Sequence, residues 1–216
     1  MRRLIYVLML LLLALTVGCA TRKSYDYTEY KTSDPKSILI LPPKNSTPDV
    51  KASYSLYSHT QRPLSEAGYY VFPIALVDET FKNNGLTVID DIHLVDTAKL
   101  YQIFGADAAL YIDIKEYGTK YYIVKSASVV TAQGRLVDLK SGNLLWEGSA
   151  TASSEEGKDN QGGLAGMLIS AIVDQVVGSV FDKSYSVSAI TTNRLLSPMK
   201  HDGVLYGPRS RLYKSK

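Results

Sequence analysis

The sequence has a single cysteine, Cys19, among 216 residues. One cysteine excludes an internal disulfide and any metal site built from several cysteines. The three histidines, His59, His93 and His201, lie far apart and lack the paired spacing of zinc sites. The sequence also lacks a Gly-x-Ser-x-Gly nucleophile motif and a Gly-Lys-Ser/Thr phosphate-binding motif. These absences favour a non-enzymatic protein with no metal site and no other cofactor.

The net charge of the sequence is also small. The 24 basic and 21 acidic residues give a formal net charge of +3. Removing residues 1–18, which hold Arg2 and Arg3 and no acidic residue, leaves +1. A nucleic-acid-binding domain needs a large basic excess to meet the phosphate backbone. We therefore predict no nucleic-acid partner.

The longest apolar run covers residues 4–15 and follows the two arginines. Twelve residues are too few to span a bilayer, which takes about 20, but they fit the core of a signal peptide. Gly18 and Cys19 stand where cleavage is expected, in a pattern that resembles the lipobox of bacterial lipoproteins. The pattern departs from the lipobox at Thr16, where leucine is preferred. We predict a signal peptide over 1–18, cleaved after Gly18, and lipidation of Cys19.

The residue after the cysteine is Ala20, which resembles the usual signal for sorting to the outer membrane. The domain is then anchored by lipid in the outer membrane and faces the periplasm, with surface exposure left open. A secreted protein with a chance cysteine is the alternative. Residues 19–36 are polar and lack apolar periodicity, so we predict a flexible linker there.

The rest of the chain alternates strand and helix patterns before it turns β-rich. Residues 121–139 predict one bent strand with a bulge at Gly134, joined by a turn at 140–143 to a partner strand. Residues 110–115 alternate in polarity, which predicts a strand with one wetter face. The other predicted strands lie at 37–43 and 68–73, and the predicted helices at 49–66, 75–84, 96–104 and 164–181.

This order predicts an α/β (α+β) fold with a mixed β-sheet of about five strands flanked by helices in two or three layers. The pattern beyond Lys183 is irregular up to Pro198. We predict a single domain over residues 37–200. A basic tail follows over 201–216, which would either lie on a membrane or partner or fray.

Tyrosine is abundant, with 16 residues against 4 phenylalanines. Tyrosine is enriched at interfaces because it combines apolar area with a polar tip, although half-buried strand positions explain it equally well. The helix at 164–181 has a wide apolar face that suggests a homodimer. The candidate partner interface comprises Tyr69, Tyr70, Tyr121, Tyr122, Ile172, Val176 and Val180.

Three stretches occur in a familiar order: the strand 38–43 that ends in two prolines, Gly105-Ala106-Asp107 before a strand, and the 137–146 hairpin ending in Trp146. Together they resemble the periplasmic α/β module of curli-secretion-channel lipoproteins, the N-terminal domain of the Tol-system propeller protein, and lipoprotein activators of peptidoglycan synthases. The whole chain, with Gly203–Arg209, is similar to a family of bacterial outer-membrane lipoproteins of the meningococcal genome-derived antigen type.

The resemblance implies a binding or assembly subunit of an envelope secretion or transport complex, with a curli-channel-like lipoprotein as a candidate partner. It carries no catalytic residues to this chain. An activator of a peptidoglycan synthase is an alternative, although the short linker counts against it. A periplasmic hydrolase is the other alternative, and the missing nucleophile and metal motifs count against that one.

Overall fold

The computed structural model describes residues 25–121, 126–156, 183–200 and 202–215. Its centre is a six-stranded mixed sheet in the order β3-β1-β4-β5-β6, with β2 paired to β4. The strand β1 runs parallel to β3 and β4, whereas β4, β5 and β6 form an antiparallel meander. The predicted mixed α/β fold is confirmed. The strands are β1 (Ser37–Ile40), β2 (Lys44–Asn45), β3 (Tyr70–Val71), β4 (Ala108–Tyr121), β5 (Ser126–Asp138) and β6 (Leu144–Ser153).

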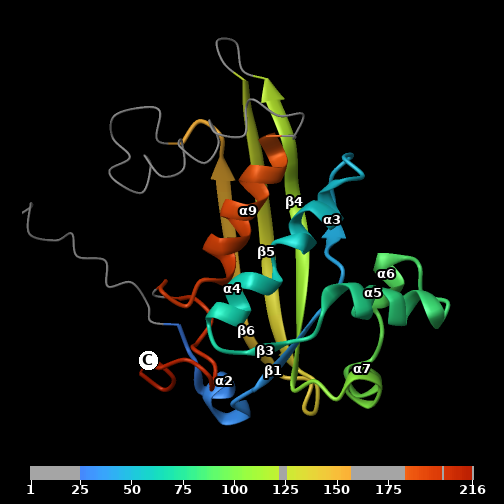
Figure 1. Cartoon of the computed structure of the whole chain (residues 1–216), viewed down its shortest axis with the longest axis vertical. Helices are drawn as coiled ribbons and strands as arrows, with labels where there is room; N and C mark the ends of the chain where they lie inside the picture. Colours follow the sequence, from blue (N-terminus) through green and yellow to red (C-terminus); the bar gives the residue numbers. More distant parts are fainter. Residues whose placement is uncertain (1–24, 122–125, 157–182, 201, 216) are drawn as a thin grey trace, which may run out of the picture.

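Helices pack on both faces of this sheet (Figure 1). Because side chains alternate along a strand, Ile38 and Ile40 face one layer while Leu39 and Leu41 face the other. The first layer holds α3 (Ala52–Ser58), α4 (Gln61–Glu66) and α9 (Lys183–Leu196), and the second holds α5 (Ile74–Asn83), α6 (Ile89–His93) and α7 (Thr97–Phe104).

Single residues at its two ends explain where α7 begins and where it stops. The Asp96 carboxylate accepts a hydrogen bond from the Ala98 N–H at 2.8 Å, which caps the first turn. Gly105 ends the helix with φ +66°, and Gly142 takes φ +76° in the 140–143 turn. The helix predicted at 96–104 and the turn predicted at 140–143 are confirmed.

The interpretation of residues 121–139 as one strand is wrong. The strand β4 continues to Tyr121, and β5 begins at Ser126 as its antiparallel partner. Gly134 is not a bulge either, because its pairing is continuous with Ile112 on one side and Gly148 on the other. The register shifts lie instead between Ile114 and Glu116, and between Leu136 and Val137.

The Asp-x-x-Ser-Gly motif of the hairpin is a structural device. The Asp138 carboxylate accepts hydrogen bonds from the backbone N–H groups of Lys140 and Ser141 at 2.9 and 2.7 Å. It also accepts one from the Ser33 hydroxyl. Burial opposes the charge, but these hydrogen bonds outweigh it and lower the pKa of Asp138. The motif therefore shapes a turn and ties it to the N-terminal segment.

The predicted linker is wrong for residues 25–36. These residues include the helix α2 (Thr28–Ser33), and Tyr30 is buried in the main core. The Tyr27 hydroxyl donates to the Gly203 carbonyl at 2.5 Å, and Tyr25 also packs against the core. A polar, tyrosine-rich segment reads as a linker because its apolar area lies in tyrosine rings rather than aliphatic side chains.

The C-terminal segment is part of the fold, not a free tail. Val204 and Leu205 are buried, and the Gly207 N–H donates to the Ala67 carbonyl at 2.9 Å. The Trp146 indole N–H donates to the Asp202 carbonyl at 2.8 Å. The domain therefore extends beyond residue 200, and the boundary predicted there is wrong.

A further helix, α9, lies where the sequence looked irregular. Its buried face consists largely of serine and threonine, including Thr191 and Thr192, whose hydroxyls donate to the carbonyls of Val187 and Ser188. The helix predicted at 164–181 lies outside the described residues.

Trp146 fills the space above two glycines of the meander. A Cβ on Gly148 would come within 2.4 Å of the Trp146 ring, and one on Gly134 within 3.3 Å. Trp146 is 1% exposed, so its ring has little room to move aside. Glycine is thus required at 148 for lack of space rather than for its backbone angles.

We expect Gly148→Ala to lower the free energy of unfolding by about 2 kcal/mol, because the added methyl group overpacks the core. The matched control is Ser149→Ala, the next residue of the same strand, which is exposed and should change it by less than about 0.5 kcal/mol. Urea denaturation followed by circular dichroism measures both. Equal effects of the two substitutions would contradict the packing argument.

Candidate functional site: an open polar face of the sheet

The face of the meander opposite α9 carries three rows of polar side chains. Each row crosses β4, β5 and β6 through paired residues, as the strand register shows. We call this set the open face: Tyr111, Arg135 and Glu147 in the first row, Asp113, Gln133 and Ser149 in the second, and Glu116, Thr131 and Thr151 in the third.

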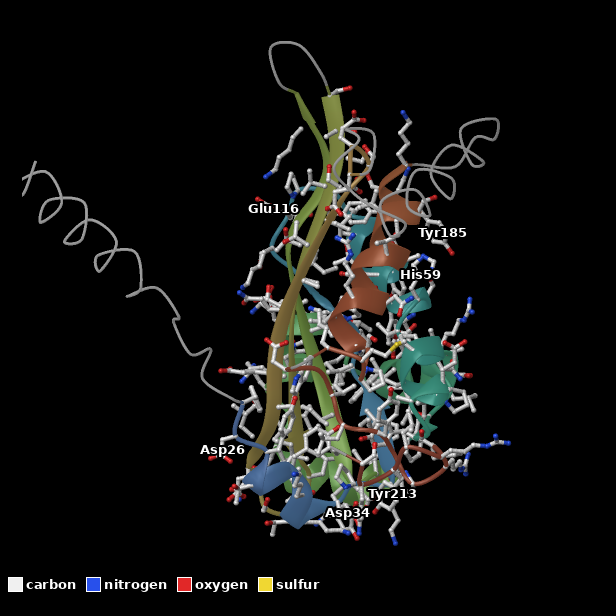
Figure 2. All side chains as sticks on the ribbon, turned by 90° about the vertical axis from the view of Figure 1, so that its left-hand side faces the viewer. Asp26, Asp34, His59, Glu116, Tyr185 and Tyr213 are labelled. Atoms are coloured by element: carbon white, nitrogen blue, oxygen red, sulfur yellow. The ribbon has the colours of Figure 1, made fainter. Side chains whose placement is uncertain are left out.

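The rows between them point to the core. Ile112 pairs with Gly134 and Gly148, and Ile114 pairs with Ala132 and Ala150. All of these apolar positions lie under α9, while the polar rows lie on the other side. Figure 2 shows the sheet nearly edge-on, with Glu116 on the side away from Tyr185 and His59. The wetter face predicted for β4 is part of this surface.

Hydrogen bonds link the three strands across the third row. The Thr131 hydroxyl donates to the Glu116 carboxylate at 2.9 Å and lies 3.0 Å from the Thr151 hydroxyl. Lys120 donates to the other oxygen of Glu116 at 2.5 Å. The Lys120 and Thr131 hydrogen bonds lower the pKa of Glu116, so it stays ionised at neutral pH.

The first two rows form the floor of a hollow of about 790 Å³. Lys44, Asp90 and His93 line one side of the hollow, and Tyr25 lines it beside Glu147. The Lys44 ammonium and the Asp90 carboxylate form an ion pair at 2.6 Å. Open, mixed-charge walls of this kind fit a polar partner surface better than a small apolar ligand.

The aromatic and charged groups of the hollow stack on one another. The His93 ring meets Tyr111 edge-on with 5.4 Å between centroids, and the Arg135 guanidinium lies 5.7 Å from the Tyr111 ring centre. His93 Nε2 donates to the Pro42 carbonyl at 2.8 Å, because a carbonyl can only accept. Burial lowers the pKa of His93, so the imidazole is neutral at pH 7.

These contacts give His93 a structural role and leave Arg135 as the exposed cation of the floor. Arg135 forms no ion pair with any residue in the described part of the chain, and its side chain reaches solvent.

Within the described ranges, no three His, Cys, Asp or Glu residues come together to hold a metal ion. No described helix is both long and apolar enough to cross a membrane.

Of the predicted interface residues, only Tyr69 and Tyr70 have side chains in the described part of the chain. Tyr69 is 3% exposed and hydrogen-bonded inside the core, so its prediction as a docking residue is wrong. Tyr70 is 44% exposed, and the Arg209 guanidinium lies 5.6 Å from its ring centre. Tyr121 ends β4, but its side chain is outside the description. Tyr122, Ile172, Val176 and Val180, together with Gly18 and Cys19, fall outside the described residues.

The predicted interface residues include no residue of the open face. Its signal is the alternation of Thr131, Gln133 and Arg135 with small or apolar residues on β5, repeated on β6 by Glu147, Ser149 and Thr151. Such alternation in consecutive strands predicts a sheet with one uncovered side.

Comparison with known proteins identifies the family. Residues 25–209 match the family described as "Putative lipoprotein GNA1162-like". A protein of Neisseria meningitidis serogroup B described as a "putative lipoprotein" is 51% identical over 195 residues, which cover 89% of this chain and 90% of that protein.

Two solved structures are also similar. The crystal structure of lipoprotein GNA1162 from Neisseria meningitidis is 52% identical, with a TM-score of 0.55 over 67% of this chain and all of that one. The PelC dodecamer from Paraburkholderia phytofirmans is 14% identical, with a TM-score of 0.47 over 79% of this chain and 90% of that one, too weak a likeness to transfer any property. The family resemblance seen in the sequence is confirmed, and the chain belongs to the GNA1162-like lipoprotein family.

Proposed function

We propose that this chain is a lipid-anchored, non-enzymatic assembly subunit of a cell-envelope complex for secretion or transport, and that the open face docks its protein partners. The observation that carries the proposal is the uncovered, polar side of β4, β5 and β6, set against the opposite side that α9 covers. Candidate partners are a curli-channel-like lipoprotein and a second copy of this chain.

The chemistry of the open face suits a reversible protein contact. Interfaces between proteins that also exist apart are about as polar as the rest of their surfaces, and arginine and tyrosine are enriched in them. Arg135 stacked near Tyr111 supplies such a pair at the floor of the hollow. Glu147 is paired with Arg135 in the first row, and Asp113 and Glu116 stand in the second and third rows, so the surface is complementary to a partner of mixed charge.

Lipidation of Cys19 would hold the domain close to its membrane. The described chain begins at Tyr25, six residues after Cys19, so a tether between them reaches at most about 22 Å at roughly 3.6 Å per residue. A tether of this length raises the local concentration of the domain for partners in the same membrane. So short a tether also counts against the alternative that this chain activates a peptidoglycan synthase, because an activator must reach across the periplasm.

The hollow supports binding better than hydrolysis. The imidazole of His93 uses its Nε2–H to hold the Pro42 carbonyl, and its ring packs against Tyr111. Its other nitrogen, Nδ1, is then the basic one, but among the described residues no hydrogen bond joins it to a nucleophilic side chain, as a general base would need. The geometry at His93 therefore favours a structural histidine.

We expect Cys19→Ala to release the protein from the outer membrane, because the acyl chains supply the anchoring energy. Fractionation of envelopes followed by immunoblotting measures the release, and Ala20→Ser is the control that keeps the cysteine. In the natural protein, mass spectrometry should find an acylated residue 19 after cleavage behind Gly18. A Cys19→Ala protein that stays with outer-membrane lipid after a salt wash would contradict the anchor.

We expect a photo-crosslinking residue at Gln133 or Ser149 to capture envelope proteins in living cells, because both positions lie exposed on the open face. The control position is Lys99 on α7, which is also exposed but lies outside the open face. The captured proteins are identified by mass spectrometry. Secretion or transport components support the proposal, whereas a peptidoglycan synthase alone would favour the activator alternative. Equal capture at Lys99 would contradict docking at the open face.

A further inference from the structure

A second cavity, separate from the open face, lies where α2 meets the C-terminal segment. Its volume is about 340 Å³, near the lower end of the range of small-molecule pockets. Four tyrosines contribute to its lining, and two lysines and one aspartate are its charged groups. We call it the tyrosine pocket: Tyr30, Lys31, Asp34, Pro35, Tyr69, Leu205, Tyr206, Leu212, Tyr213 and Lys214.

The inner part of the tyrosine pocket is apolar in character. The Tyr69 hydroxyl donates to the Leu205 carbonyl at 2.7 Å, and the Tyr30 hydroxyl lies 2.9 Å from the Tyr69 hydroxyl. Both side chains are at least 97% buried, and burial raises the pKa of each. Because these hydroxyls are neutral and already engaged, they present mainly ring surface to a ligand.

The charged groups carry a net positive charge. The Tyr213 hydroxyl donates to the Asp34 carboxylate, with both oxygens at 2.5 Å, and the Lys214 ammonium lies 3.5 Å from it (Figure 2). The single aspartate is therefore used within the protein. Lys31 has no ion-pair partner among the residues that the structure describes and is exposed. The two lysines outnumber the one acid by one charge.

We propose that the tyrosine pocket binds an anionic amphiphile, with an apolar body against the tyrosine rings and an acidic headgroup at Lys31 and Lys214. Aromatic and aliphatic walls with a few placed polar groups are typical of such sites. Two sources would present this chemistry: a phospholipid still in its membrane and an amphiphile free in solution. The proposal is independent of the docking role of the open face.

The position of the tyrosine pocket favours this ligand class. Its wall includes α2, the first described helix after the predicted lipid anchor, and Figure 2 shows Asp34 and Tyr213 together at the end of the domain where the described chain begins. Anionic lipid surfaces attract lysines that lie near them.

A matched pair of fluorescent probes tests the headgroup. N-phenyl-1-naphthylamine and 8-anilinonaphthalene-1-sulfonate share one ring system and differ by a sulfonate. We expect the sulfonated probe to bind about fivefold more tightly, as two lysine contacts of modest strength would give. A titration followed by fluorescence measures both dissociation constants. Equal affinity for the two probes would overturn the proposed headgroup site.

Charge-reversal variants locate the site. The double variant Lys31→Glu with Lys214→Glu should remove the preference for the sulfonated probe, whereas Lys99→Glu on α7 should keep it. Both changes fall on exposed side chains, and circular dichroism checks that the folds match. An unchanged preference in the double variant would overturn the assignment to the tyrosine pocket.

A second pair of variants tests the apolar wall. Leu212 is 49% exposed and lines the pocket, so Leu212→Asp should weaken both probes. Val50→Asp, at a side chain that is 86% exposed and outside the pocket, should weaken neither. Equal effects of the two substitutions would contradict binding against this wall.

Competition distinguishes the two sources. We expect a phosphatidylglycerol with short chains, below its critical micelle concentration, to displace the sulfonated probe if free amphiphiles enter. Displacement only by phosphatidylglycerol vesicles, and not by phosphatidylcholine vesicles, would identify the membrane as the source. Failure of both phosphatidylglycerol forms to compete would overturn the proposal that such lipids are the ligand.

Discussion

The two-residue period of the β4–β6 meander is the constraint on which the structure depends. One set of positions must be small or apolar to fit beneath α9, and the set between them is largely polar, because the described helices reach it only at Tyr111, which is buried beside α6. A slip of one residue in β5 would place Arg135 under α9 and Ala132 in water, so the register is strongly specified. Trp146 reinforces it, since its ring fits only where Gly134 and Gly148 leave room. The open face is therefore a direct product of the same packing that makes the core.

Tyrosine plays a different part in this fold from the one its abundance suggests. The hydroxyls of Tyr27, Tyr57 and Tyr69 donate to the backbone carbonyls of Gly203, Ile40 and Leu205, which joins segments far apart in the chain. A tyrosine can fill apolar space and still satisfy a buried carbonyl, so it suits a core that includes irregular segments. The tyrosine pocket arises where several of these side chains meet the C-terminal segment.

The sequence was informative wherever a local signal decides the structure. Asp96, Gly105 and Gly142 marked a helix cap, a helix end and a turn because each role depends on a side chain or a backbone angle at that position. The helix α9 was not predicted from the sequence, because its buried positions, such as Ser188 and Thr192, are hydroxyl residues that form hydrogen bonds within their own helix.

The candidate site was less predictable than the fold. Its three rows join residues far apart in the chain, such as Tyr111 and Glu147 through Arg135, and the bulge beside Ile114 changes which residues meet. The polar alternation within each strand was visible, but the absence of a covering helix on that side is a tertiary property. For the same reason, residues 25–36 and 202–215 look irregular in the sequence: each is buried by tertiary contacts, with the other segment, with the sheet and with the turn after α4.

The hydroxyl of Tyr213 meets Asp34 at the end of α2, so the last part of the described chain returns to its first described helix. With the lipid anchor that we propose at Cys19, a fluorescent protein or affinity handle fused behind Lys216 would consequently emerge close to the membrane. Reporter fusions at this terminus would strain the very attachment that they are meant to reveal, and an epitope inserted between Tyr121 and Ser126 would stand clear of it.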